Sequence, residues 1–449
     1  MSENRALLTP QNTLPQNLRW LEEVQALQRS IVSEGFEQTL EVIERLVGDG
    51  FKRHAFPCGS EVFTWIVPPR WKVRGATIKA NGKTLVDVSH HPLHLLTHSA
   101  PFRGTVTREE LLQHLYTDPD RPEAIPYKFS FYQPKWGFCI PHQWLDQFTA
   151  DRYDVVIDTE LSNQGELVIG EVTLAGQSPR RIVFSAHLDH PGQVNDGLSA
   201  VAALIELIRI FRGTGGYRGY FTLTFLFTCE TIGALCYLQR FENDAKQWME
   251  GCIAPDILAN RQPLAFAESF SGDTQLDRAA QCIFTERFGE FVRQPFLYLA
   301  ANDDQVFDGP GFLIPSLSIA RFPYREYHSS LDSLNTFDPD KFTEAVSVMR
   351  DIVELLNRNV VPHPLFKNIP FLTRYGIWFE WCSIPVHRNP LEKFLRLMDG
   401  KHSLVDLCVE SGLSLPLCEQ FLGTMRVHNL VACDPPPPIK VSPSNHDRK

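Results

Sequence analysis

The stretch RIVFSAHLDHPGQVNDGLSAVAALIEL, residues 181–207, changes within a short space from strand to polar loop to helix. Residues 181–186 are largely apolar and β-branched, as in a strand buried on both faces, whereas residues 198–210 are apolar at helical spacing. The loop between them carries His187, Asp189, His190, Asn195 and Asp196. In an open α/β sheet this is the carboxyl end of a strand, where ligand crevices form. The loop is therefore a candidate part of an active site. The alternative is an ordinary surface loop in which Asp196 caps the helix that follows.

The segments on both sides continue an alternation of strands and helices. Residues 153–158, 166–173 and 220–228 are predicted strands, and helices are predicted to begin at Leu198 and Ile232. Strands that alternate with helices of this length indicate a mostly parallel sheet. A packed helical segment is predicted over residues 18–47, and a long amphipathic helix over residues 342–357.

The chain of 449 residues is too long for one hydrophobic core, so two or three domains are expected. Short alternating strands and an Asn81-Gly82 hairpin signal mark residues 59–141 as a small β-rich module. The many aromatic residues of this module are predicted to fill its core and the domain seam, and an aromatic substrate cleft is the alternative.

Residues 361–365 indicate a break between domains, and the sequence pattern of residues 370–434 differs from that of the α/β domain. Three short helices with tight turns and a strand-like end resemble a winged helix-turn-helix. Its acidic and basic residues are nearly balanced, so we expect protein contact, self-association or packing on the α/β domain rather than DNA binding. Residues 435–449, which begin with four prolines, are predicted to form a disordered tail.

The overall composition restricts the partners. A net charge of −10 and a pI near 5.9 argue against nucleic acid or an anionic membrane. The sequence shows neither a signal peptide at its start nor an apolar run long enough to span a bilayer. The ten cysteines are scattered without CxxC pairs, as in a reduced protein. A cytoplasmic protein with a peptide or small-molecule substrate is expected.

Three further loops carry side chains suited to the same crevice. Glu230 follows the predicted strand 220–228, Asp256 lies in an otherwise apolar run, and His328 lies in a polar turn. With His187 and Asp196 these residues can bind two divalent metal ions, one carboxylate bridging both. The alternative is that these residues have only structural roles. Asp196 and Glu230 would cap helices, Asp256 would form a salt bridge, and His328 would lie on the surface.

Five motifs resemble those of the co-catalytic di-zinc aminopeptidases, whose fold glutaminyl cyclases share. They are His187-Leu188-Asp189, Asn195-Asp196-Gly197, Glu230 to Gly233, Asp256 to Leu258, and Tyr327 to Asp332. The match covers residues 153–357. The whole chain resembles more closely a bacterial branch of aminopeptidase-like proteins of unknown function, with an inserted β module and a winged helix. EVFTWIVPPRW, IPYKFSFYQPKWGFC and YHSSLD carry that closer likeness.

The resemblance implies a zinc exopeptidase-like fold: a mostly parallel mixed α/β sheet flanked by helices, with an inserted small β domain and a C-terminal winged helix-turn-helix. The catalytic domain would then be discontinuous, residues 1–58 and 142–360, interrupted by the inserted β-rich domain of residues 59–141. It also implies two zinc ions. His187 and Asp256 would bind one ion, and Glu230 and His328 the other. Asp196 would bridge the two ions, and Asp189 would orient His187.

One position departs from the family pattern. Active members carry a glutamate immediately before the metal-binding glutamate, and it takes a proton from the bridging water. Here that position is Cys229, and a thiol on an apolar strand is a poor base for this task. Asp303, Asp304 and Glu326 are the candidates to replace it.

The predicted function is metal-dependent hydrolysis of an amide bond, aminopeptidase-like in its substrate. Two alternatives remain open at this point. One is an amidohydrolase or deacylase that acts on a sugar or another non-peptide metabolite. The other is a catalytically silent metal-binding protein, in which the winged helix recruits a partner.

Overall fold

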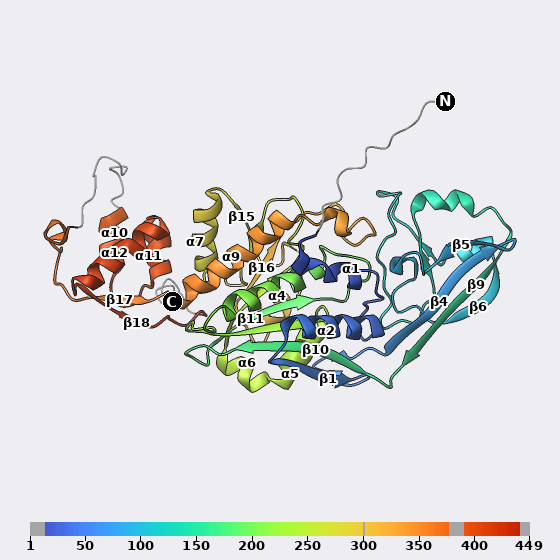
Figure 1. Ribbon diagram of the computed structural model, residues 1–449, viewed down its shortest axis with the longest axis horizontal. Coiled ribbons are helices and arrows are strands. Elements are labelled where there is room, and N and C mark those ends of the chain that lie inside the picture. Colours follow the sequence, from blue (N-terminus) through green and yellow to red (C-terminus); the bar gives the residue numbers. More distant parts are fainter. Residues whose placement is uncertain (1–13, 300, 377–389, 441–449) are drawn as a thin grey trace, which may run out of the picture.

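The computed structural model describes residues 14–299, 301–376 and 390–440 (Figure 1). An eight-stranded mixed sheet forms its centre, in the order β1-β10-β12-β11-β13-β16-β14-β15. These strands are β1 (Phe51–Pro57), β10 (Glu166–Leu174), β11 (Arg181–His187), β12 (Thr222–Thr228), β13 (Met249–Pro255), β14 (Ala265–Ala267), β15 (Val292–Gln294) and β16 (Ser316–Ala320). The four central strands β12, β11, β13 and β16 are mutually parallel, so their carboxyl ends share one edge. The predicted α/β fold with a mostly parallel mixed sheet is confirmed.

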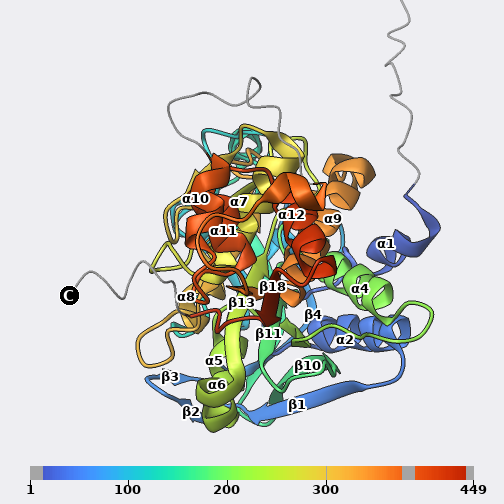
Figure 2. The ribbon, with the colours of Figure 1, turned by 90° about the vertical axis from the view of Figure 1, so that its left-hand side faces the viewer.

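Helices cover both faces of this sheet (Figures 1 and 2). Helix α4 (Leu198–Arg212) packs against α2 (Glu34–Val47) and α9 (Pro339–Asn357), and α9 packs against α7 (Gln275–Phe288). The opposite side carries α5 (Ile232–Arg240) and α6 (Glu242–Trp248). Strands β11 and β12 are buried along nearly their whole length, because both of their faces are covered.

The helical segment predicted over residues 18–47 is divided into two helices. The chain forms α1 (Trp20–Val24), then a connector, then α2, whose N-cap Ser33 has extended backbone and accepts a hydrogen bond from Phe36 N. Apolar residues in the connector continue the helical spacing, so periodicity alone did not reveal the cap. The connector matters because it carries Arg29 beneath the loop that follows β11.

The inserted β domain extends further along the chain than predicted. Its four-stranded sheet has the order β5-β4-β9-β6, formed by β4 (Arg70–Ala80), β5 (Lys83–Asp87), β6 (Phe102–Thr107) and β9 (Arg152–Ser162). The prediction that residues 153–158 belong to the central sheet is therefore wrong. Tyr153, Val155 and Ile157 alternate with exposed residues and enter the insert's own core, as expected of a strand covered on one face only.

The C-terminal unit contains α10 (Pro390–Leu397), α11 (Leu404–Ser411) and α12 (Leu415–Val427). After them comes β18 (Val431–Asp434), which pairs antiparallel with β17 (Val361–Pro364). The three helices match the prediction, but the winged helix-turn-helix is not confirmed. Residues 361–365, where a break between domains was expected, instead largely form a strand of this unit. The extended segment β17 pairs with β18.

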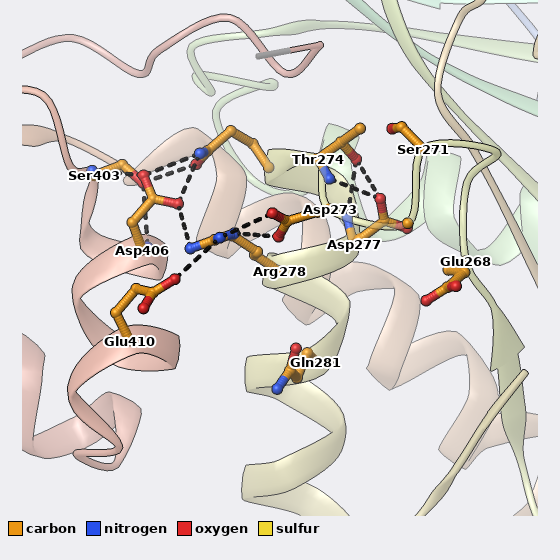
Figure 3. A network of polar contacts seen from close by, with 12 residues as sticks. Glu268, Ser271, Asp273, Thr274, Asp277, Arg278, Gln281, Ser403, Asp406 and Glu410 are labelled. Carbon is orange, nitrogen blue, oxygen red and sulfur yellow. Dashed lines mark hydrogen bonds and ion pairs between the residues drawn. The ribbon is translucent and has the colours of Figure 1, made fainter. Parts of the chain in front are cut away.

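Polar contacts hold this unit against the α/β domain (Figure 3). The guanidinium of Arg278 on α7 lies 2.7 Å from Asp273, 3.1 Å from Asp406 and 3.2 Å from Glu410. Asp406 and Glu410 both lie on α11, so one buried cation joins the two units.

The tail predicted to be disordered from Pro435 is ordered as far as Lys440. Arg180 donates hydrogen bonds to the carbonyls of Pro436 and Pro437, and Ile439 is fully buried. Prolines have no backbone N–H, so a proline run cannot form regular backbone hydrogen bonds with itself. The Arg180 guanidinium supplies donors for two of its carbonyls, and the run packs on the core. Residues 441–449 lie outside the described part of the chain.

The structure also bears on the expected absence of membrane-spanning helices and on the state of the cysteines. None of the described helices combines the length and the apolar character needed to cross a membrane. The nine described cysteines are free thiols, and all but Cys433 are buried, as expected of reduced core residues.

Candidate metal centre

Loops at the carboxyl ends of the parallel strands bring the predicted metal ligands together. His187 ends β11, and Asp256 directly follows β13. His187 Nε2 lies 3.4 Å from Asp256 Oδ2 and 3.5 Å from Asp196 Oδ1. The other oxygen of Asp196, Oδ2, lies 3.3 Å from His328 Nε2. Asp196 therefore stands between the two histidines, in the place of a bridging carboxylate.

Glu230 and an unpredicted residue, His190, complete the cluster. His190 Nδ1 lies 3.2 Å from Asp196 Oδ1, and His190 Nε2 lies 3.5 Å from Glu230 Oε2. The side chain of Glu230 is 32% exposed, whereas that of His190 is 4% exposed. The sequence placed His190 in the polar loop but gave it no role. A second histidine three residues after the first was the signal that could have identified it.

Backbone N–H groups fix the carboxylates of this site. Asp332 accepts hydrogen bonds from Asn195 N at 2.8 Å and Asp196 N at 2.9 Å. Asp256 Oδ1 accepts from Gly197 N at 2.9 Å. Gly197 has φ +82°, and a Cβ there would lie 2.9 Å from His187 O, so only glycine fits. The Asn-Asp-Gly motif thus owes its glycine to a close approach of two backbone segments.

Arg29 supports the same loop from below. Its guanidinium is fully buried and donates to the carbonyls of Leu188 and His190, each at 2.6 Å, and to that of Gln193 at 2.8 Å. Burial lowers the pKa of Arg29 to about 10, against the opposing effect of nearby carboxylates, so it stays charged at neutral pH. One cation therefore fixes the path of the chain from residue 188 to residue 193.

The pKa values of the clustered carboxylates and histidines are strongly shifted, as expected of a site that binds a cation. Burial, and then the charge of Asp256, raises the pKa of Asp196 to about 7. Burial also raises the pKa of Glu230 to about 7 and lowers that of His328 to about 4. Burial opposes protonation of His187, but Asp256 and Asp189 outweigh it and raise its pKa well above 6.5.

Two buried atoms of the cluster lack a hydrogen-bond partner, Asp196 Oδ2 and His328 Nε2. They lie 3.3 Å apart without forming a hydrogen bond to each other. Unsatisfied carboxylate oxygens and imidazole nitrogens at this spacing are the donor set of zinc and similar divalent ions. The residues therefore fit a metal ion.

The replacements considered for the missing glutamate occupy different positions. Cys229 is fully buried, and burial raises its thiol pKa well above 9. Asp303 is buried with both oxygens engaged, by Ser185 Oγ at 2.6 Å and Thr231 N at 2.9 Å, so it holds the loop after β12. Asp304 accepts a hydrogen bond from Asn302 N at 2.7 Å. Among the described ion pairs, none joins the carboxylate of Glu326 to the cluster.

A cavity of about 620 Å³ opens from the cluster toward the inserted β domain. Asp189, His190 and Glu230 line it together with six aromatic residues, two lysines and several other polar and aliphatic side chains. The aromatic rings belong to Trp65, Tyr116, Tyr127, Phe129, Phe131 and Tyr132. The ring of Tyr127 stands edge-on to His190, with 4.8 Å between centroids. The insert's aromatic residues thus divide into two groups, since Trp71 and Phe138 fill its core as predicted.

The fold is that of the zinc aminopeptidases, so the predicted likeness to this superfamily is confirmed. The zinc aminopeptidase BSAP from Bacillus subtilis superposes with a TM-score of 0.57 at 12% identity, covering 75% of this chain and 92% of its own. A "putative peptidase" from Clostridium acetobutylicum superposes with a TM-score of 0.82 at 24% identity, covering 93% of this chain and 95% of its own.

The sequence places the chain more narrowly. Residues 18–359 match the family described as "Domain of unknown function (DUF4910)", and the chain belongs to that family. A relative from Clostridium acetobutylicum is 28% identical over 88% of this chain and 90% of its own length. Its name is "Putative polysaccharide biosynthesis protein with aminopeptidase-like domain".

Proposed function

We propose that this protein is a metal-dependent amide hydrolase of the aminopeptidase type, with two zinc ions held on either side of Asp196. The observation that carries the proposal is the position of this carboxylate. One oxygen faces His187, which also meets Asp256, and the other faces His328. A buried carboxylate shared by two sets of donors is the arrangement that a two-metal site requires.

Zinc bound there would supply Lewis acidity to a hydrolytic water and to the carbonyl of the scissile amide. The chain's own residues hold the site in shape. Asp189 Oδ1 lies 3.5 Å from His187 Nδ1 and orients the ring. Tyr127 packs against the rings of His190 and His328, which keeps bulk water from that side of the cluster.

A peptide with a free amino terminus is the first substrate class, because the shared fold is that of aminopeptidases. A second candidate is an amide on a sugar or another non-peptide metabolite. Aromatic rings such as Phe129 and Tyr132, both about half exposed at the cavity, suit the apolar face of a sugar ring. The word polysaccharide in the name of the relative favours the same substrate class.

Metal content and hydrolysis, measured on one preparation, test the proposal. The metal-free protein is reloaded with zinc and assayed against aminoacyl p-nitroanilides, dipeptides and N-acetylated amino sugars. We expect hydrolysis that depends on zinc and is lost in Asp196→Asn but kept in Asp158→Asn, a matched change at a surface ion pair. Metal retention without any hydrolysis would favour the catalytically silent alternative. No bound zinc, and no rise in Tm on adding it, would contradict the proposal.

A further inference from the structure

We infer that His190 is a metal donor of the cluster and that Glu230 is the carboxylate that holds its ring, rather than a ligand. The inference rests on the proposed function, because it concerns the same metal site. It changes the ligand set that the superfamily resemblance implies, which includes Glu230 and leaves out His190.

The donor atoms of His190, His187 and Asp196 are spaced as ligands of one ion. His187, His190 and Asp196 each offer one ligand atom, and the three atoms lie within 4.8 Å of one another. His190 Nδ1 is 3.2 Å from Asp196 Oδ1, the same oxygen that lies 3.5 Å from His187 Nε2. Two donors on one tetrahedral zinc ion are about 3.3 Å apart when each bond is about 2.0–2.1 Å. Both separations suit donors that share an ion.

The other ring nitrogen of His190 has a carboxylate partner. A histidine that binds a metal commonly gives its second N–H to a carboxylate, which fixes the ring. His187 follows this pattern, with Nε2 toward Asp196 and Nδ1 3.5 Å from Asp189. His190 repeats it with the nitrogens exchanged, because Nδ1 faces Asp196 and Nε2 lies 3.5 Å from Glu230.

The contact between the two rings agrees with this assignment. His190 Nδ1 and His187 Nδ1 lie 3.1 Å apart, within hydrogen-bond distance, so at most one of them carries a hydrogen. When that hydrogen is on His187, directed to Asp189, the lone pair of His190 Nδ1 is free for a cation.

His190 and Glu230 differ in burial and in the contacts that hold them. His190 is 3% exposed, its carbonyl accepts a hydrogen bond from Arg29, and its ring contacts Tyr127. Glu230 has a partly exposed side chain that lines the cavity, and among the described ion pairs its carboxylate meets only His190. The imidazole of His190 is therefore fixed in a position from which it can bind a metal ion. The carboxylate of Glu230 faces the cavity that a substrate would enter.

Zinc binding to the metal-free full-length chain tests the inference, with wild type, His190→Gln, Glu230→Gln and His54→Gln compared by calorimetry. We expect His190→Gln to weaken one zinc site by more than about 100-fold, since loss of an outer partner alone costs about 10–100-fold. Glu230→Gln should keep the wild-type number of ions and lose only about 10–100-fold in affinity. His54, which pairs with Glu171 away from the cluster, is the matched control and should show no change.

An X-ray absorption spectrum of the zinc-loaded wild type needs no variant and guards against a misfolded one. Three coordinating imidazoles per chain, from His187, His190 and His328, are expected, against two if Glu230 takes the place of His190. Wild-type affinity in His190→Gln, or loss of a whole zinc equivalent in Glu230→Gln alone, would overturn the inference and leave the proposed function intact. A wild type that binds no zinc would overturn both.

Discussion

Replacing Arg29 by methionine should both destabilise the fold and weaken metal binding. The guanidinium donates to three carbonyls of the loop from residue 188 to residue 193, at 2.6 to 2.8 Å. A hydrogen bond from a charged donor contributes about 1.5–3 kcal/mol, which gives an upper value of about 5–9 kcal/mol for three. Relaxation and entering water reduce this, and removal of one partner from a buried charged network typically costs about 3–5 kcal/mol. We expect Arg29→Met to lower the free energy of unfolding by that smaller amount.

The effect on the metal follows from the loop, which carries His190 and leads to Asp196. If about half of the lost free energy had held the loop in its binding conformation, zinc affinity falls about 10–100-fold, since each 1.4 kcal/mol is tenfold. Urea unfolding of the metal-free protein, followed by zinc titration, measures the two quantities separately.

Arg180→Met is the matched control. Its guanidinium also binds two backbone carbonyls and the carboxylate of Glu250, but it precedes β11, at the end opposite to His187. This variant should lose stability and keep the zinc affinity of the wild type. An Arg29→Met protein that is destabilised by less than about 1 kcal/mol, or that binds zinc as tightly as the wild type, would refute the reasoning.

Three further outcomes are expected. The pKa values of Asp196 and Glu230, both about 7, lie above their ordinary values of 3.8 and 4.5, so these two groups contribute stability to the metal-free fold that is lost as pH rises from about 4 to about 7. His328, whose pKa is lowered to about 4, offsets part of that loss. The rise in Tm that zinc produces should grow over the same window, and a constant rise would contradict this. Cys229→Ala should keep metal content and activity within about twofold, and the buried thiol should resist modification until unfolding; a loss of turnover would show that the thiol acts. Phe129→Ala, at a side chain that is 55% exposed, should change stability by less than about 0.5 kcal/mol yet raise KM about 3- to 10-fold, and an unchanged KM would remove this ring from the substrate site.

The central fold could be predicted because its strands carry strong local signals. β11 and β12 are short apolar runs buried on both faces, and α4 follows with helical spacing. β9 was placed in the wrong sheet because its alternating pattern specifies one covered face without saying which sheet provides it. The connector that carries Arg29 was hidden in an apparently continuous helical pattern, since a single cap decides where a helix begins.

The site could be predicted where residue type and position at a strand end agreed. His187, Asp196, Asp256 and His328 converge as expected. His190 was passed over because a sequence does not show which way a loop directs its side chains. The aromatic wall of the cavity depends on a contact between the insert and residues near His328, far apart in the chain. Tyr127 N donates to His328 O at 2.8 Å, and no local pattern predicts that pairing.

Anomalous diffraction from zinc-loaded crystals, recorded on both sides of the zinc absorption edge, is the decisive test of a two-zinc site at Asp196. Anomalous peaks are expected on both sides of Asp196, one within bonding distance of His187 and Asp256 and one beside His328. A map without a peak at this loop, or with zinc bound only elsewhere on the chain, would contradict the two-zinc site.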